Sequence, residues 1–155
     1  MTANGAVRAS EDQLILQSDI DELTRVHPWI ERMACSYAIP ADAQYSMNLC
    51  LEEILSNIIR YGYSNEPGHS IAVRFASISE GDFLLVIEDH APPFNPLTEP
   101  LLPIEDTLEG KREGGLGIRL FRSFAGNATY ESMPGGNRLS IRFLGSTPAP
   151  GKPIA

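Results

Sequence analysis

Residues 51–63 read LEEILSNIIRYGY, and this stretch carries the pattern that decides the fold. Its apolar residues recur at the spacing of an α-helix: Leu51, Ile54 or Leu55, Ile58 and Tyr61. That spacing predicts a helix with one apolar face packed on the rest of the protein. Glu53 and Asn57 stand four residues apart, so they lie on one side of this helix. The sequence therefore raises the question of why a carboxylate and an amide lie among isoleucine and leucine side chains.

The composition is that of a globular protein, with 43% hydrophobic and 21% charged residues in a chain of 155. We expect one domain over residues 11–145, with flexible tails at 1–10 and 146–155. No apolar run approaches the roughly 20 residues of a membrane span, and the first residues lack the apolar stretch of a signal peptide. Cys35 and Cys50 fall in helical patterns and are expected to be reduced core thiols, which favours a cytoplasmic location.

The formal net charge of −8 argues against direct binding to nucleic acid, which requires a basic face. It does not exclude a nucleotide, whose phosphates can be held by backbone N–H groups, a helix N-terminus and Mg²⁺. The three histidines are scattered along the chain and suggest no metal cluster.

The periodicity predicts α- and β-elements in a single α+β domain. The expected elements are a strand at Leu14–Gln17, helices at Asp19–Tyr37 and from Pro40 to about Tyr61, strands at Ser70–Ser79 and Asp82–Asp89, a long loop at 90–113, a helix at 115–125 and a hairpin of 127–132 with 137–144. Pro28 is expected to kink the first helix or to mark its late start. Ile71, Val73 and Phe75 alternate, as do Leu84 and Val86, which is typical of strands. Whether other residues of the apolar run FLLVI belong to this alternation stays open.

The segment EGGLGIRLF places Gly114, Gly115 and Gly117 where a helix opens. Glycines there let the backbone approach a ligand closely, and the free N–H groups of a helix start favour anions. Such glycines are often simple turn residues, so the motif alone does not decide between a turn and a phosphate site.

The segment VIEDHAPPFNP ends a hydrophobic strand at Asp89. An aspartate at a strand end is commonly a turn residue or a helix cap. A buried aspartate can instead accept a hydrogen bond from an exocyclic amine such as that of adenine. The segment by itself leaves both interpretations open.

Taken in order, these segments resemble the Bergerat-type nucleotide fold of the GHKL superfamily, and most closely the anti-sigma factor serine kinases of the RsbW and SpoIIAB type. Those proteins carry an LxxEExxxN-like helix, a D-x-G-x-P-F segment and a GGLGL segment in this order, and the resemblance covers about residues 14–144. It implies a two-layer α/β sandwich, with a mixed, mostly antiparallel sheet, helices on one face and an ATP lid.

The resemblance also implies roles for particular residues. Glu53 would be the general base that takes the proton of an acceptor serine, and Asn57 would be a ligand of Mg²⁺. Asp89 would hold the adenine amino group. The other nucleotide-binding positions would be Ala91, Gly114, Gly115, Leu116, Gly117 and Asn137. An Asn137 that serves only as a turn residue of the hairpin is an equal alternative.

The sequence departs from the family pattern at Ala91, where the family has glycine. Alanine fits there only if its φ is negative or if adenine sits slightly further out. Arg60 and Tyr61 also replace residues usual in the family, and Lys111 and Arg112 precede the glycine motif without an assigned role.

The resemblance implies an ATP-binding anti-sigma factor that phosphorylates a serine on an anti-sigma-factor antagonist. The alternative is a nucleotide-binding partner-switch regulator without kinase activity. A histidine-kinase catalytic domain is disfavoured because no hairpin with a phospho-accepting histidine precedes the core. The implied partners are a sigma factor, the antagonist and a second copy of the chain, bound through the early strand and first helix. Trp29, Ile30 and Met33 could serve that contact or belong to the core.

Overall fold

The computed structural model describes residues 12–95 and 128–144. Its elements are β1 (Asp12–Gln17), the 3₁₀ helix η1 (Ile20–Arg25), α1 (Val26–Tyr37), α2 (Ala41–Asn57), the π-helix η2 (Ile58–Gly62), β2 (Ser70–Ser79), β3 (Asp82–Asp89), β4 (Ala128–Met133) and β5 (Gly136–Leu144). The expected helix at 115–125, the glycines 114–117, the tails and most of the long loop lie outside the described residues.

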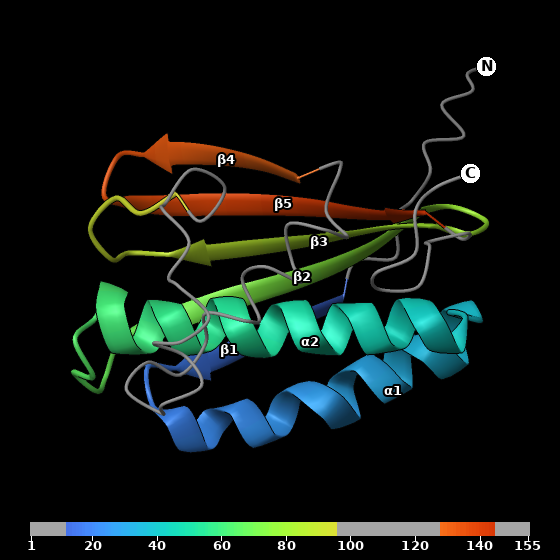
Figure 1. Ribbon diagram of the computed structural model, residues 1–155, viewed down its shortest axis with the longest axis horizontal. Helices are drawn as coiled ribbons and strands as arrows, with labels where there is room; N and C mark the ends of the chain where they lie inside the picture. Colours follow the sequence, from blue (N-terminus) through green and yellow to red (C-terminus); the bar gives the residue numbers. More distant parts are fainter. Residues whose placement is uncertain (1–11, 96–127, 145–155) are drawn as a thin grey trace, which may run out of the picture.

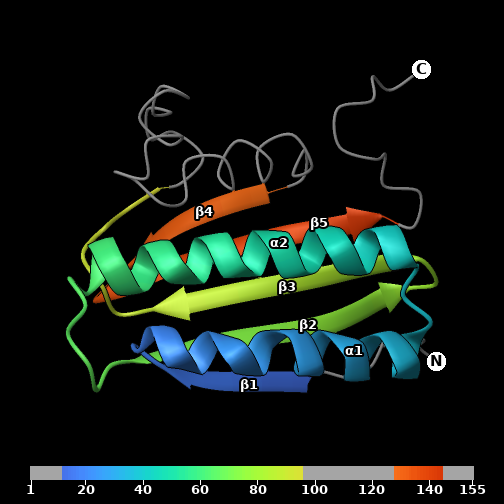
Figure 2. The same cartoon turned by 60° about the horizontal axis from the view of Figure 1, so that its bottom comes forward.

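The five strands form one sheet in the order β1-β2-β3-β5-β4, and every neighbouring pair is antiparallel. Helices α1 and α2 lie side by side on one face of this sheet, as both views show (Figures 1 and 2). The protein is therefore a two-layer α+β sandwich, as predicted. In the described ranges, no helix is both long and apolar enough to cross a membrane.

The core lies between the helices and the sheet, and alternate strand residues point into it. Ile71, Val73 and Phe75 are all fully buried, as their alternation predicts. In β3, where the sequence left the phase of FLLVI open, Phe83, Leu85 and Ile87 are buried while Leu84 and Val86 are only half-buried. The pairing explains which residues are buried. Val73 lies opposite Ile87 and Phe75 opposite Leu85, and directly paired residues share one face of a sheet.

The first α-helix begins later than Asp19, which confirms one of the two expectations for Pro28. Residues Ile20–Arg25 form a 3₁₀ helix, and α1 starts at Val26, so Pro28 falls in the first turn, where its missing N–H costs no helical hydrogen bond. Trp29, Ile30 and Met33 are buried in the core.

The expectation of two buried thiols is only half right. Cys50 is buried, whereas Cys35 is exposed on the outer side of α1. The α1 residues that do enter the core are Val26, Trp29, Ile30 and Met33, which recur at helical spacing and leave Cys35 off that face.

The second helix changes its geometry at the residue predicted to bind a metal ion. Residues Ala41–Asn57 are α-helical, and the next five form a π-helix in which Tyr63 N–H donates to the Ile58 carbonyl at 2.8 Å. The wider π turn breaks the α-helical phase. Tyr61, predicted to lie on the buried face, is therefore 54% exposed, while Tyr63 is buried at 6%.

Candidate functional site

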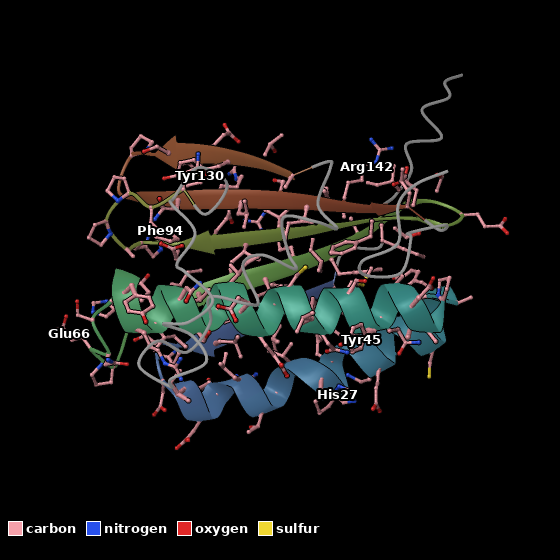
Figure 3. All side chains as sticks on the ribbon, viewed as in Figure 1. His27, Tyr45, Glu66, Phe94, Tyr130 and Arg142 are labelled. Atoms are coloured by element: carbon pink, nitrogen blue, oxygen red, sulfur yellow. The ribbon has the colours of Figure 1, made fainter. Side chains whose placement is uncertain are left out.

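A pocket opens where the end of α2 meets the ends of β3, β4 and β5. Figure 3 shows Phe94 and Tyr130 at this end of the sheet, far from Arg142. Most of its wall is apolar, and two buried polar side chains, Asp89 and Asn137, project from the adjacent strands β3 and β5. The lining residues are Ile54, Asn57, Ile58, Gly62, Ile87, Asp89, Ala91, Pro92, Phe94, Tyr130, Asn137 and Leu139.

Asp89 ends β3 and is held rigidly in the pocket wall with only 6% of its surface exposed. Its Oδ1 accepts hydrogen bonds from Ala91 N–H at 2.8 Å and from Asn137 Nδ2 at 2.9 Å. Burial raises the pKa of the Asp89 carboxyl, although those two hydrogen bonds and the nearby His90 act in the opposite direction. Both bonds end on Oδ1, and the described residues donate no hydrogen bond to Oδ2, which can accept one from a ligand.

Asn137 is the second residue of β5 and lies opposite Asp89 in the strand register. Besides its bond to Asp89, Nδ2 donates to the carbonyls of Ala91 at 3.1 Å and Pro92 at 3.2 Å. Its Oδ1 accepts from Phe94 N–H at 3.1 Å and from the Tyr130 hydroxyl. The buried Asn137 side chain therefore holds the 89–94 turn in place through hydrogen bonds. The alternative, that Asn137 is only a turn residue of the hairpin, is wrong because it lies in β5.

Ala91 fits its place without backbone strain. Within the described chain the non-glycine residues with positive φ are Ala38, Ser64 and Asn65, so the φ of Ala91 is not positive. Its methyl group faces Gly62, where an added Cβ would come within 2.9 Å of the Ala91 Cβ. The missing side chain at Gly62 therefore makes room for the one that Ala91 adds.

Glu53 and Asn57 stand four residues apart on α2, so their side chains are neighbours on the surface of the helix. Burial raises the pKa of the Glu53 carboxyl to about 7, while the Asn57 side chain and the positive charge of Arg60 oppose this shift. Asn57 carries an amide oxygen, which is a type of atom that can bind a cation. The neighbouring Glu52 is exposed.

The two residues face different hollows. Asn57 lines the pocket of Asp89, whereas Glu53 lines an adjoining groove between η1 and α2, with Leu23, Thr24 and Arg60 among its walls. Glu53 is therefore not among the residues that line the pocket of Asp89. The Glu53 Oε2 atom is buried, and no hydrogen-bond partner for it is found in residues 12–95 and 128–144.

The structure brings together four of the predicted site residues, Asn57, Asp89, Ala91 and Asn137, while Glu53 lines a separate groove. The predicted phosphate-binding segment Gly114–Gly117 lies outside the described residues. Sequence reasoning did not assign several apolar wall residues and Tyr130. Phe94 had a signal, since it ends the D-x-G-x-P-F segment, but the others come from strand and helix positions that look like ordinary core.

The donor set indicates which ligand the pocket fits. An apolar pocket with one fixed carboxylate fits a flat heterocycle that carries an exocyclic amine. No cluster of three or more histidine, cysteine or acidic side chains is present in the described part of the chain. A lone Asn57 oxygen suits an ion such as Mg²⁺, which keeps several waters and takes substrate phosphates as its other ligands.

Comparison with known proteins agrees with this geometry. The chain is 27% identical over 114 residues to the serine/threonine-protein kinase BtrW of Bordetella bronchiseptica, covering 73% of this chain and 79% of that protein. Its fold matches the crystal structure of the RsbU and RsbW domains of Rv1364c from Mycobacterium tuberculosis with a TM-score of 0.58 at 11% identity. That match covers 94% of this chain but only 34% of the larger one, so the chain spans about a third of that protein.

The family profile of the histidine kinase-like ATPase domain matches residues 16–143, which include all the described elements from the end of β1 to β5. The chain therefore belongs to the histidine kinase-like ATPase domain family.

Proposed function

We propose that the protein binds Mg·ATP and transfers its γ-phosphoryl group to a serine on a partner protein. The observation that carries the proposal is the buried Asp89 carboxylate at the end of an apolar pocket, next to the Glu53–Asn57 pair. Membership of an ATPase family supports the nucleotide, and the likeness to a serine/threonine-protein kinase supports the transfer.

The adenine base occupies the apolar pocket in this proposal, and Asp89 Oδ2 accepts a hydrogen bond from its amino group. Ile58 and Leu139 in the pocket wall exclude water from the ring faces. Guanine is disfavoured because it carries a carbonyl oxygen where adenine carries the amine, and two acceptors would then face each other. The backbone of Gly114, Gly115, Leu116 and Gly117 is proposed to hold the phosphates.

Asn57 holds Mg²⁺ through Oδ1 in this proposal. When bound, the ion supplies neutralisation of phosphate charge. Glu53 acts as the general base for the acceptor hydroxyl in this proposal, because it lies one helical turn from Asn57 and lines a groove that a partner segment can enter. Its pKa of about 7 suits a base that works near neutral pH.

The partners proposed are a sigma factor, which the protein would sequester, and a small antagonist that carries the acceptor serine. The RsbW domain in the similar structure shows the fold alone, so this part of the proposal depends on the resemblance of the motifs. The acidic charge of −8 favours action through proteins over direct contact with nucleic acid.

Transfer of label from ATP to the antagonist tests the kinase. Glu53→Ala should keep nucleotide binding and lose transfer by about a hundredfold or more, since a base acts on the transition state. Glu52→Ala, one residue away and exposed, should transfer at the wild-type rate. Equal losses in the two variants would refute the role of Glu53. Binding of ATP without any transfer by the wild type would favour the non-kinase switch.

A further inference from the structure

Tyr63 links the second helix to the turn that carries Asp89. Its backbone N–H closes the π turn on the Ile58 carbonyl at 2.8 Å, and its side chain is buried. Its hydroxyl oxygen accepts a hydrogen bond from His90 N–H at 2.6 Å and donates one to the Ser70 carbonyl at 3.3 Å. One phenol therefore contacts the backbone of both β2 and the residue that follows β3.

The place of this hydroxyl in the sheet is specific. The β2–β3 register pairs Ala72 with Glu88, and two further residues along each strand would pair Ser70 with His90. The Tyr63 hydroxyl bonds to the His90 N–H and to the Ser70 carbonyl, one group from each residue of that next pair. Direct pairing of the two strands therefore ends before His90, and the chain leaves the sheet directly after Asp89.

The ring that carries the hydroxyl is itself fixed. It stacks parallel on His69, with ring centroids 4.5 Å apart. His69 N–H donates to Ser18 Oγ at 3.0 Å, and Ser18 Oγ donates to the Glu66 carbonyl at 2.6 Å. These bonds tie the loop between η2 and β2 to the end of β1, so the hydroxyl has little freedom to follow His90 if that residue moves.

The protonation of Tyr63 matches this double role. Burial raises the pKa of the phenol, the His90 hydrogen bond lowers it, and the negative charge of Asp89 raises it again. The hydroxyl therefore keeps its proton and can donate to Ser70 while it accepts from His90.

We propose that Tyr63 is a positioning residue for nucleotide binding, which holds the 89–94 turn so that Asp89 and Ala91 keep their places in the pocket wall. The inference rests on the proposed nucleotide site. Tyr63 acts through the His90 backbone and touches no part of the ligand. The neighbouring Gly62 lets the same π turn approach Ala91, so the end of the second helix fixes the turn by one hydrogen bond and one close contact.

Tyr63→Phe tests the proposal because it removes the hydroxyl and keeps the ring. The dissociation constants of Mg·ATP and Mg·ADP should both rise about tenfold, since the His90 N–H loses its acceptor and the turn shifts. Tyr61→Phe is the matched control, because Tyr61 is 54% exposed, and its affinity should stay within about twofold of the wild type. Ile59→Val controls for general loss of stability, since Ile59 is buried in the same π turn and does not line the pocket.

Amide hydrogen exchange at His90 gives a second readout that does not need nucleotide. The wild-type His90 amide should exchange slowly although the residue is exposed, and at least about tenfold faster in Tyr63→Phe. Wild-type affinity in a folded Tyr63→Phe protein would overturn the inference, and so would fast exchange in the wild type. A wild type that binds no nucleotide would refute the proposed function instead, and the exchange comparison would still decide whether Tyr63 holds the turn.

Discussion

At the scale of a single residue, burial changes what the Glu53 carboxyl does near neutral pH. In the folded protein its pKa is about 7, against an ordinary value of 4.5. Between these two values the folded state keeps the proton that the unfolded chain has released. The contribution of Glu53 to stability is therefore fully present below about pH 4.5 and is lost as the pH rises through 7.

Glu53→Gln, which has no proton to lose, should remove this pH dependence. Relative to the wild type, its free energy of unfolding should rise by about 1–2 kcal/mol between pH 5 and pH 8, after a discount for the partial exposure of the side chain. Urea unfolding at both pH values measures the difference. Glu52→Gln is the control, and its free energy of unfolding should differ little from that of the wild type at either pH. If the Glu53→Gln and wild-type proteins lose or gain stability in parallel, Glu53 is not a buried carboxyl with a raised pKa.

The same pKa predicts how transfer depends on pH. Only the deprotonated Glu53 can act as a base, so the rate of phosphoryl transfer at saturating ATP should rise through pH 7 and level off above about pH 8. A rate measured from pH 5.5 to 9 checks this expectation. A flat profile over that range would mean that another group, or none, takes the proton.

At the scale of elements, the site depends on how closely β5 approaches the end of β3. Gly136 opens β5, and a Cβ added there would lie 2.0 Å from the Asp89 carbonyl oxygen, which belongs to the backbone and cannot move aside. The glycine therefore allows the contact that places Asn137 opposite Asp89. This is a packing requirement, because the described residues with positive φ do not include Gly136.

Gly136→Ala should destabilise the fold by about 2–4 kcal/mol and displace the Asp89 turn. Thermal unfolding measures the first effect. Gly135→Asn is the matched control: Gly135 has a φ of 80° and open space around its Cα, and asparagine tolerates that conformation well. Its melting temperature should stay within a few degrees of the wild type. If the two variants are equally stable, the close approach of β5 is not required.

Much of the element order could be predicted from the sequence, and the errors have local physical causes. Alternation identified β2 and β3 as strands, but a continuous run such as FLLVI has two possible phases, and only its pairing with β2 decides which residues are buried. Helical spacing predicted the burial of Leu51 and Ile58 correctly. It was wrong for Tyr61, because no feature of LEEILSNIIRYGY indicates a π turn.

The candidate site, too, could be predicted only in part from the sequence. Glu53, Asn57 and Asp89 could be selected because motif order adds information that spacing alone lacks. The hydrogen bonds of Asn137 and the role of Tyr63 could not be predicted from the sequence. Each depends on which backbone groups the folded strands leave without partners. The freedom of Ala91 from backbone strain likewise follows from its observed φ.

At the scale of the whole molecule, one face of the sheet carries the helices (Figure 2). The predicted homodimer contact through the early strand and first helix finds little support there. Trp29, Ile30 and Met33 belong to the core. The outer edge of β1 is also partly occupied, because Arg25 donates to the Ile15 carbonyl at 2.9 Å and Gln17 N–H donates to Glu22 at 3.0 Å.

The homodimer remains a prediction, and Ile15 is the residue that tests its location. Its side chain is 42% exposed on β1, so a contact through the early strand would bury it. Light scattering should then give a dimer for the wild type and a monomer for Ile15→Glu, because an unpaired charge would be buried in the contact. Gln13→Glu, exposed on the same strand, controls for added charge. A monomeric wild type at high concentration would remove the prediction.

The central claim is that the pocket around Asp89 binds the adenine of Mg·ATP. Titration calorimetry on the wild type and on Asp89→Asn tests it most directly. The wild type should bind one Mg·ATP, and Asp89→Asn should bind it about 10- to 100-fold more weakly, since a charge-assisted hydrogen bond of about 1.5–3 kcal/mol is lost. A folded wild type that binds no nucleotide in the presence of Mg²⁺, or an Asp89→Asn variant with unchanged affinity, would contradict the account.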